Sequence, residues 1–265
     1  MDISLIETLR WEPAGGFVRL ERHLARLARS AAALGLAGAE GARHALLAAL
    51  PPSALPDISP SRGKIDGGRS PLSSSAPGAA ETTSAPEGNP GFLPTSPLED
   101  EMSGRAEGDA SQPGSFRTRL ELFADGRIDI QTAPFTPLPP ETVWRLKLAA
   151  TRLVSDDPLL RHKTSRRALY TAARAEFPAA EADEVLLLNE RGELCEGTIT
   201  SLFLDDGSGR LKTPPLESGL LAGILREELL ETGRAIEAVL RPADLARGAI
   251  LIGNSLRGLI RGRLA

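Results

Sequence analysis

The sequence has few of the features that mark secreted, membrane or nucleic-acid-binding proteins. Its 265 residues include one cysteine, Cys195, so no internal disulfide can form and a reducing cytoplasm is expected. No apolar run reaches the roughly 18 residues of a membrane span, and the start "MDISLIETLR" lacks the basic and apolar regions of a secretory signal. Lys and Arg total 31 against 35 Asp and Glu, which leaves no basic excess for nucleic acid. We therefore expect a cytoplasmic protein without membrane or nucleic-acid partners.

Residues from about 52 to 115 differ in composition from the rest of the chain. They are rich in Pro, Gly, Ser, Ala and Glu, have few large apolar side chains and show no periodicity. Such a segment cannot bury enough apolar surface to offset its conformational entropy. We predict a disordered insert inside a smaller N-terminal domain of residues 1–135. The proline-rich stretch "TAPFTPLPP" then leads to a larger domain of residues 136–265.

Outside the insert, alternating strand and helix patterns predict an α/β protein. "DISLIETLRW" is typical of a strand, and "FRTRLELFADGRIDIQ" predicts two strands around a turn at Asp125 and Gly126. "LERHLARLARSAAALG" predicts a helix with one apolar stripe. The stripe consists of Leu20, Leu24, Leu27, Ala31 and Leu34. In the second half strands and helices continue to alternate, and "AILIGNSLRGLIRGRLA" predicts one closing strand.

Lys163 is the one lysine in a segment, "LLRHKTSRRALYTAARAEF", whose other long basic side chains are arginines. A guanidinium cannot lose its proton in a protein, whereas an amine can lose its proton and attack a carbonyl. The neighbouring cations Arg161, Arg166 and Arg167 would lower the pKa of that amine and favour the neutral nucleophile. From this segment alone, a solvated basic patch at the start of a helix explains the lysine equally well.

Five motifs follow one another along the two halves of the chain and omit the insert. They are "RHLARL", "HKTSRRALY", "NERGELCEGTITSLFL", "TPPLESGLLAGILRE" and "GNSLRGLIRGRL". In this order they resemble the class IV pyridoxal-phosphate aminotransferase family, which has the fold-type-IV architecture and includes branched-chain and D-amino-acid aminotransferases and 4-amino-4-deoxychorismate lyase. "LIETLRW", "RHKTSRRALY" and "GNSLRGLIRGRL" are most similar to the lyase-like domain fused behind the synthase component in para-aminobenzoate synthesis proteins.

The resemblance implies two α/β domains with pyridoxal 5'-phosphate between them. It gives Lys163 the covalent bond to the cofactor aldehyde and, once the lysine is released, proton transfer on the substrate. Glu196 matches the glutamate that binds the pyridine nitrogen; Glu193 is the neighbouring alternative, but Glu196 has the Gly-Thr that the family pattern requires after it. Because the freed lysine supplies acid–base chemistry, we expect His23 and His162 to serve packing or hydrogen bonding.

The cofactor phosphate is expected where "ESGLLAGILRE" turns into a helix, because a helix N-terminus offers N–H groups and a favourable dipole to an anion. By resemblance, Leu221 and Ile224 would donate backbone N–H groups to the phosphate, and Arg26 would clamp it with its two-pronged guanidinium. Asn254 or Ser255 would supply a last contact, and the sequence does not choose between them.

Three functions remain open from the sequence. The first is a lyase that converts 4-amino-4-deoxychorismate to 4-aminobenzoate and pyruvate in folate biosynthesis. The second is a branched-chain or D-amino-acid aminotransferase, which would use the same lysine, glutamate and phosphate site. The third is a non-catalytic partner of a synthase subunit, which the short segment before "IETLRW" motivates and the retention of Lys163, Glu196 and Arg26 opposes.

Other residues receive weaker assignments. Arg257 is a candidate ligand for a substrate carboxylate, with a solvent-facing strand residue as the alternative. No group of residues has metal-ligand spacing, and we give Cys195 no catalytic role because buried thiols are usually inert. The resemblance further implies a homodimer, with a separate aminodeoxychorismate synthase subunit as a possible second partner.

Overall fold

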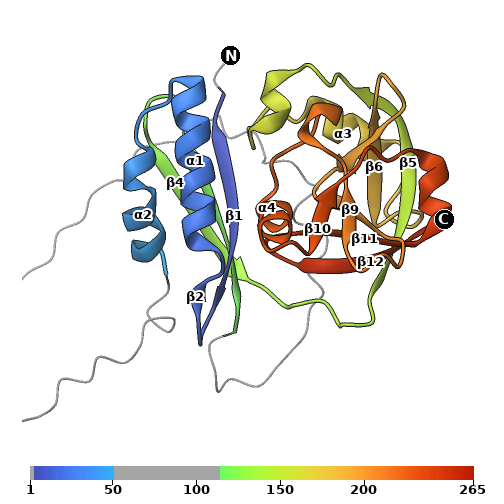
Figure 1. The fold of residues 1–265 in the computed structure, drawn as a ribbon. Coiled ribbons are helices and arrows are strands. Elements are labelled where there is room, and N and C mark those ends of the chain that lie inside the picture. The colour runs from blue at the N-terminus through green and yellow to red at the C-terminus, as the bar shows by residue number, and fades with distance from the viewer. Residues whose placement is uncertain (1–2, 51–113) are drawn as a thin grey trace, which may run out of the picture. The chain divides into compact units, whose positions relative to one another are not determined.

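The computed structural model describes residues 3–50 and 114–265, so the predicted insert falls almost wholly outside the described residues. The described chain forms a four-stranded sheet and an eight-stranded sheet with helices packed on them, which confirms the predicted α/β class (Figure 1). No helix in residues 3–50 or 114–265 is long and apolar enough to cross a membrane.

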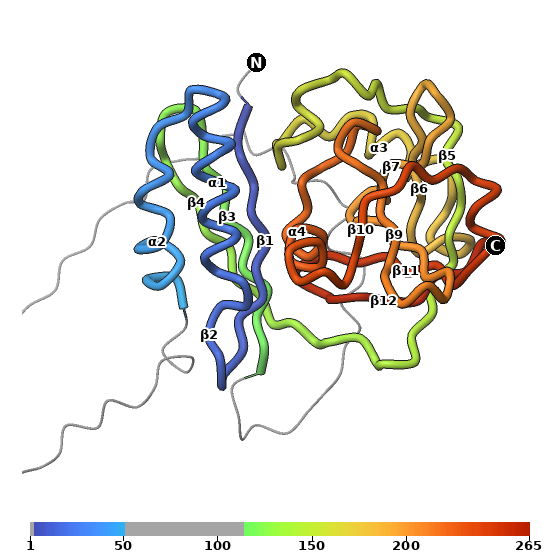
Figure 2. Tube along the Cα trace, viewed as in Figure 1, coloured from blue at the N-terminus to red at the C-terminus, as the bar shows by residue number. Residues whose placement is uncertain are grey.

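The first sheet joins strands from both sides of the insert. In chain order its strands are β1 (Leu5–Glu12), β2 (Gly16–Phe17), β3 (Phe116–Leu122) and β4 (Ile128–Pro134). Their order in the sheet is β2-β1-β3-β4, and β1 pairs antiparallel with β3 from Leu5 to Trp11 (Figure 2). The predicted turn at Asp125 and Gly126 joins β3 to β4, and Gly126 has a φ of 83°, which glycine adopts without strain.

One face of this sheet is covered by α1 (Leu20–Leu34) and the shorter α2 (Ala42–Ala48). Because side chains alternate along a strand, Leu5, Leu9 and Trp11 of β1 point to the same face and are buried with the apolar stripe of α1. The predicted stripe is confirmed: two of its members are buried and the others pack against them. Glu7 lies between Leu5 and Leu9 on the same face of β1 and is 2% exposed. A buried carboxylate therefore lies on the apolar face of the sheet.

The second sheet has the strand order β10-β9-β8-β11-β12-β5-β6-β7. Its strands are β5 (Val143–Leu153), β6 (Glu184–Asn189), β7 (Leu194–Gly197), β8 (Ser201–Asp205), β9 (Leu211–Thr213), β10 (Ala235–Glu237), β11 (Ala249–Asn254) and β12 (Gly258–Leu264). The prediction of a single closing strand is wrong, because β11 and β12 form an antiparallel hairpin. The turn is short, and its one apolar residue, Leu256, lets the segment read as continuous; Gly258, with a φ of 76°, permits the reversal.

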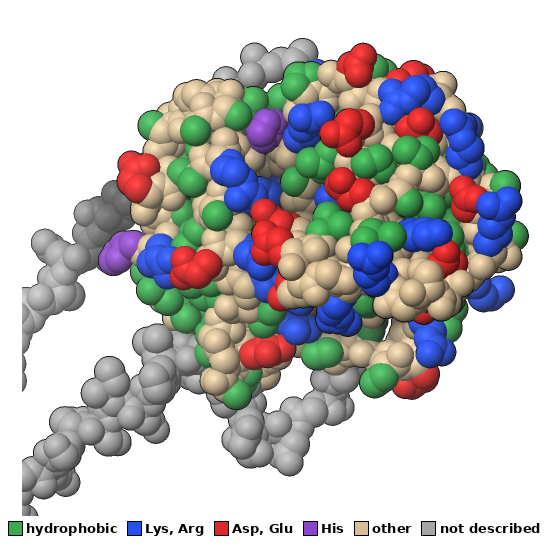
Figure 3. Space-filling model, viewed as in Figure 1, with side chains coloured by type: hydrophobic (Ala, Val, Ile, Leu, Met, Phe, Trp, Pro, Cys, Tyr) green, Lys and Arg blue, Asp and Glu red, His purple; other side chains and the backbone are tan. Residues whose placement is uncertain are grey.

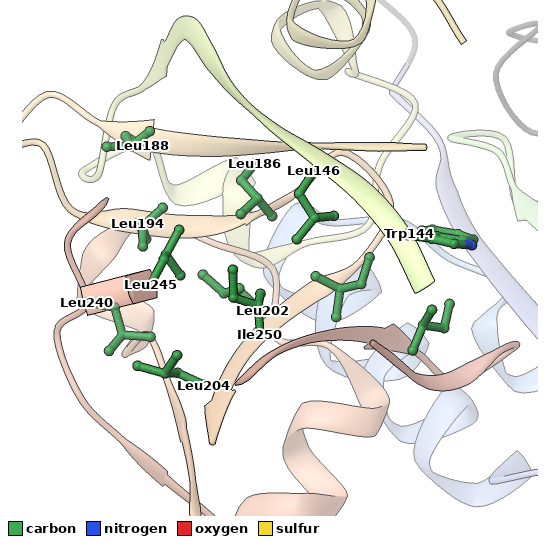
Figure 4. Close-up of a cluster of buried hydrophobic side chains, with 12 residues drawn as sticks. Trp144, Leu146, Leu186, Leu188, Leu194, Leu202, Leu204, Leu240, Leu245 and Ile250 are labelled. Atoms are coloured by element: carbon green, nitrogen blue, oxygen red, sulfur yellow. The ribbon is translucent and has the colours of Figure 1, made fainter. Parts of the chain in front are cut away.

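The core of the second sheet lies on both of its faces. β6 is buried along its whole length: Leu186 and Leu188 belong to one apolar cluster, whereas Val185 and Leu187 belong to another. Figure 4 shows the first of these clusters, with Leu186 close to residues from neighbouring strands. The second cluster contains Ala173 of helix α3 (Ala168–Ala175). A strand buried on both faces offers no surface to solvent, so β6 presents no open face to a ligand.

Candidate functional site

Lys163 lies in an extended segment between a 3₁₀ helix (Pro158–Arg161) and α3. The Ile6 N–H donates to the Lys163 carbonyl at 2.8 Å, and the Ser165 N–H donates to the Ser4 carbonyl at 3.0 Å. Thr164 forms a single antiparallel bridge with Leu5. The backbone that carries the lysine is therefore hydrogen-bonded to β1 of the first sheet, and the half-buried lysine is held where the two sheets meet.

Glu196 ends a buried strand and has an unusual electrostatic environment. Its side chain is buried at 4% exposure, and its Oε1 accepts hydrogen bonds from the Tyr170 hydroxyl at 2.7 Å and the Leu221 N–H at 3.0 Å. Burial raises the pKa of Glu196 to about 7, against the opposing influence of these two donors and of the charges on Arg167 and Lys163. The structure thus contains a desolvated carboxylate that would be stabilised by a further cationic partner.

Glu193, the neighbouring carboxylate, is already paired. It accepts hydrogen bonds from Arg191 Nη2 at 2.8 Å, Asn189 Nδ2 at 2.9 Å and Ser218 Oγ at 3.1 Å. These donors, with Arg191 the strongest, lower the pKa of Glu193 to about 2. Of the two glutamates that the sequence offers for a pyridine nitrogen, Glu196 is the one with the raised pKa.

The glycine after Glu196 is required by a second buried carboxylate, which the sequence patterns did not reveal. Glu184 is fully buried and accepts hydrogen bonds from the backbone and side chains that follow Gly197. A Cβ on Gly197 would lie 2.4 Å from Thr200 Oγ1 and 2.8 Å from the Glu184 carboxyl. Any larger residue at position 197 would push the loop away from the Glu184 carboxylate, so packing requires a glycine directly after Glu196.

Arg26 is buried, although it lies off the apolar stripe of its helix. Its Nε and Nη2 donate to the two carboxylate oxygens of Glu7 at 2.8 and 2.7 Å, and its Nη1 donates to the Ala222 carbonyl at 3.0 Å. Ala222 precedes α4 (Ile224–Glu231) by two residues. Arg26 is therefore fastened to the loop that starts the helix proposed to receive a phosphate, and Ile224 is the first residue of that helix.

The turn between β11 and β12 reaches the same network through a histidine. His23 Nδ1 lies 2.6 Å from Glu7 Oε2, and its Nε2 lies 2.8 Å from Ser255 Oγ. Asn254 faces elsewhere: its Nδ2 donates to the Ile199 carbonyl at 3.1 Å, and its Oδ1 accepts the Arg257 N–H within the turn at 2.9 Å. Of the two residues that the sequence left open, Ser255 is the one connected to Arg26.

The remaining sequence candidates make other contacts. The Arg257 guanidinium lies 5.8 Å from the centre of the Trp144 ring, and His162 Nδ1 lies 2.9 Å from Ser30 Oγ. Cys195 is buried, and burial raises the pKa of its thiol far above the usual range. A thiol held in its protonated form is a poor nucleophile.

A series of ion pairs runs between α1 and α4, where Figure 3 shows basic and acidic side chains side by side. The pairs are Arg19–Glu228 at 2.6 Å, Arg22–Glu231 at 2.5 Å and Arg29–Glu227 at 3.2 Å. Arg19 also has a φ of 59°, the one positive φ of a non-glycine residue in the described ranges. These contacts hold the helix that carries Arg26 against the helix that begins beside it.

The two ends of the site are linked by one dipeptide. The Leu221 N–H bonds Glu196, and the carbonyl of the next residue, Ala222, bonds Arg26. The Leu221 N–H thus points to the carboxylate end of the site in this structure, and its contact with a phosphate stays a prediction. A buried carboxylate at one end and a buried arginine beside a helix N-terminus at the other fit a ring with a basic nitrogen and a phosphate group.

Comparisons with known proteins agree on the family and differ on the activity. Residues 105–264 match the model of the amino-transferase class IV family. The chain is 30% identical over 154 residues to a candidate aminodeoxychorismate lyase of Schizosaccharomyces pombe, and 32% identical over 125 residues to a candidate branched-chain-amino-acid aminotransferase of Thermotoga maritima. These matches cover 56% and 46% of this chain, and 66% and 44% of the relatives, so the chain spans less than two thirds of either one.

A solved structure covers nearly the whole chain. The crystal structure of a candidate amino-acid aminotransferase from Mesorhizobium loti is 40% identical and superposes with a TM-score of 0.70. The superposition covers 99% of this chain and 100% of the other. The fold described above is therefore shared over its full length with that protein.

Proposed function

We propose a lyase function, starting from the fact that this chain belongs to the class IV aminotransferase family. Pyridoxal phosphate is the cofactor of this family. The observation that supports a site for it here is the buried Glu196, whose pKa is raised to about 7. A protonated pyridine nitrogen would add a cationic partner to the weak influence of Arg167 and Lys163, and the Glu196 charge would in turn keep that nitrogen protonated.

The residues of this chain divide the binding task between the two ends of the cofactor. Glu196, oriented by Tyr170, would hold the ring nitrogen, and Lys163 would hold the aldehyde carbon covalently. At the other end Arg26, Ile224 and Ser255 would hold the phosphate, with Asn254 supporting the adjacent loop. When bound, the cofactor supplies an electron sink that lowers the cost of removing a proton next to the substrate amine.

The proposed reaction converts 4-amino-4-deoxychorismate to 4-aminobenzoate and pyruvate. Once the substrate amine has displaced it from the aldehyde carbon, the freed Lys163 Nζ would take the proton from the ring carbon that bears the amine. The C–O bond to the enolpyruvyl group would then break, its electron pair leaving with the pyruvate enolate, which takes up a proton. The ring becomes aromatic, and the atoms of the substrate are all recovered in the two products.

The proposal is tested by incubating the protein, loaded with pyridoxal phosphate, with 4-amino-4-deoxychorismate. We expect equal amounts of 4-aminobenzoate and pyruvate. Lys163→Ala should give no product and no cofactor fixed to the protein by borohydride reduction. Lys147→Ala, a half-buried lysine on β5, is the matched control and should retain both. Product formation by Lys163→Ala would refute the role of that lysine.

An amino-acid aminotransferase is the second candidate, and the 40% identity to the Mesorhizobium loti protein over the full chain favours it. The cofactor residues are the same for both reactions, so the substrate must decide. An amino acid donor should convert the bound cofactor to its amine form, with a change in visible absorbance, and release the corresponding keto acid. Failure across a panel of L- and D-amino acids would remove this candidate.

We further propose that the active unit is a homodimer and that a separate aminodeoxychorismate synthase subunit delivers the substrate. Arg257 remains the candidate for a substrate carboxylate. Arg257→Met should then raise the KM for the substrate without altering the amount of cofactor bound. Light scattering of the loaded protein tests the dimer, and a monomer with full activity would contradict it.

A further inference from the structure

Arg26 is held by three of its five N–H donors. Two bonds go to the Glu7 carboxylate and one goes to the Ala222 carbonyl. A guanidinium carries one N–H on Nε and two on each terminal nitrogen, so these bonds leave one N–H on Nη1 and one on Nη2. The guanidinium is planar and rigid, so the three bonds determine where the two remaining donors point.

The Glu7 carboxylate contacts two side chains of α1, Arg26 and His23. Its Oε2 accepts from Arg26 Nη2 and lies 2.6 Å from His23 Nδ1. Burial alone would raise its pKa, but Arg26 and His23 lower the pKa of Glu7 to about 2. An ionised carboxylate can only accept, so His23 must carry its proton on Nδ1 and direct Nε2 to Ser255 Oγ, 2.8 Å away.

Residues far apart in the sequence are thereby held in one chain of contacts. Ser255 follows β11, Arg26 and His23 belong to α1, and Glu7 belongs to β1. All four are at most 6% exposed. An amide at position 7 could not replace the carboxylate, because its NH₂ group would face either Arg26 Nε–H or the two donors at Oε2.

We propose that Glu7 is a positioning residue of the phosphate end: it sets the orientation of Arg26 directly and of Ser255 through His23, and so gives this chain its preference for a phosphorylated cofactor. The inference rests on the proposed function, since Arg26 and Ser255 are phosphate ligands only there. Glu7 itself touches neither the cofactor nor the substrate in this proposal.

The charge of Glu7 has the opposite effect on the affinity for the phosphate, so an experiment can separate the two effects. The Glu7 carboxylate is negative and lies beside Arg26, so it also repels an anion bound to that arginine. If charge alone mattered, Glu7→Gln would strengthen the binding of pyridoxal phosphate. If the position of Arg26 matters, Glu7→Gln weakens the binding of pyridoxal phosphate, because the guanidinium is no longer held with its two free N–H groups pointing towards the phosphate.

The test compares pyridoxal phosphate with pyridoxal, which lacks the phosphate. Dissociation constants are measured by absorbance for the cofactor-free full chain, the Glu7→Gln variant and a control, Glu21→Gln. Glu21 also pairs with an arginine, Arg43 at 2.6 Å, and is exposed on the same helix as Arg26. We expect Glu7→Gln to weaken the binding of pyridoxal phosphate about ten- to hundredfold, the loss of one charged hydrogen bond, with the binding of pyridoxal unchanged. The control should leave both constants unchanged.

Two results for Glu7→Gln would overturn the proposal: an unchanged or greater preference for the phosphorylated form, or an equal loss of affinity for both ligands. If this variant does not fold by circular dichroism, His23→Gln replaces it. That change interrupts the link to Ser255 and should reduce the preference for phosphate; an unaltered preference would overturn the proposal. A wild-type chain that binds both ligands equally, or is not labelled at Lys163 after borohydride reduction, would instead refute the proposed function.

Discussion

The buried carboxylate of Glu196 makes a quantitative prediction about the stability of the cofactor-free protein. Its pKa rises from 4.5 to about 7 on folding. A raised pKa means that the folded protein holds the proton more tightly, so the contribution to stability is fully present below pH 4.5 and is lost as the pH rises through 7. At roughly 1.4 kcal/mol for each pH unit, the loss amounts to about 3 kcal/mol of unfolding free energy.

Glu196→Gln isolates this contribution. Both hydrogen bonds to the side chain, from Tyr170 and Leu221, end on Oε1, so the amide oxygen of glutamine can accept them without rearrangement. The variant has no charge to bury at position 196, so this position should not lower its unfolding free energy between pH 4.5 and 7. The difference in unfolding free energy between variant and wild type should therefore grow by about 3 kcal/mol between pH 4.5 and 7.

The assay is urea unfolding of the two cofactor-free proteins at a series of pH values. Taking the difference between them removes the influence of other groups, including His162, whose lowered pKa acts in the opposite direction over the same range. Curves for variant and wild type that stay parallel from pH 4.5 to 7 would refute the claim that Glu196 is a desolvated carboxylate. With pyridoxal phosphate bound, the difference in unfolding free energy between variant and wild type should no longer increase with pH, because the ring nitrogen would pair with the Glu196 carboxylate.

Three further changes test the packing around the site. Glu184→Gln should lower the unfolding free energy by about 1–3 kcal/mol for each donor left unsatisfied in the loop after β7, measured by urea unfolding, whereas the exposed Glu181→Gln should be neutral. Gly223→Ala should weaken cofactor binding, because its Cβ would lie 2.5 Å from Ser201 Oγ; Ser201→Ala added to it should restore affinity, and a failure to do so would reject the steric explanation. Cys195 should react with iodoacetamide only under denaturing conditions, since its thiol is buried with a raised pKa; rapid labelling of the native protein would contradict this.

Much of the fold could be predicted from local patterns. The apolar stripe of α1 and the Asp125–Gly126 hairpin turn depend on residues close together in the sequence, and both are found in the structure. The closing hairpin was missed for the same reason. Its turn is only a few residues long and lies between two strands of similar composition, so periodicity alone did not locate the reversal.

The sequence by itself determined which candidate groups this chain carries: an amine at Lys163, a glutamate followed by Gly-Thr at Glu196, and an arginine on an amphipathic helix at Arg26. Only the tertiary structure decided the state of these groups. The pKa of Glu196 depends on its burial and on Tyr170, which lies 26 residues away, and Arg26 is oriented by Glu7 and by a carbonyl 196 residues away. Desolvation and pairing set the properties of a charged group, and both are supplied by neighbours that no local pattern in the sequence can identify.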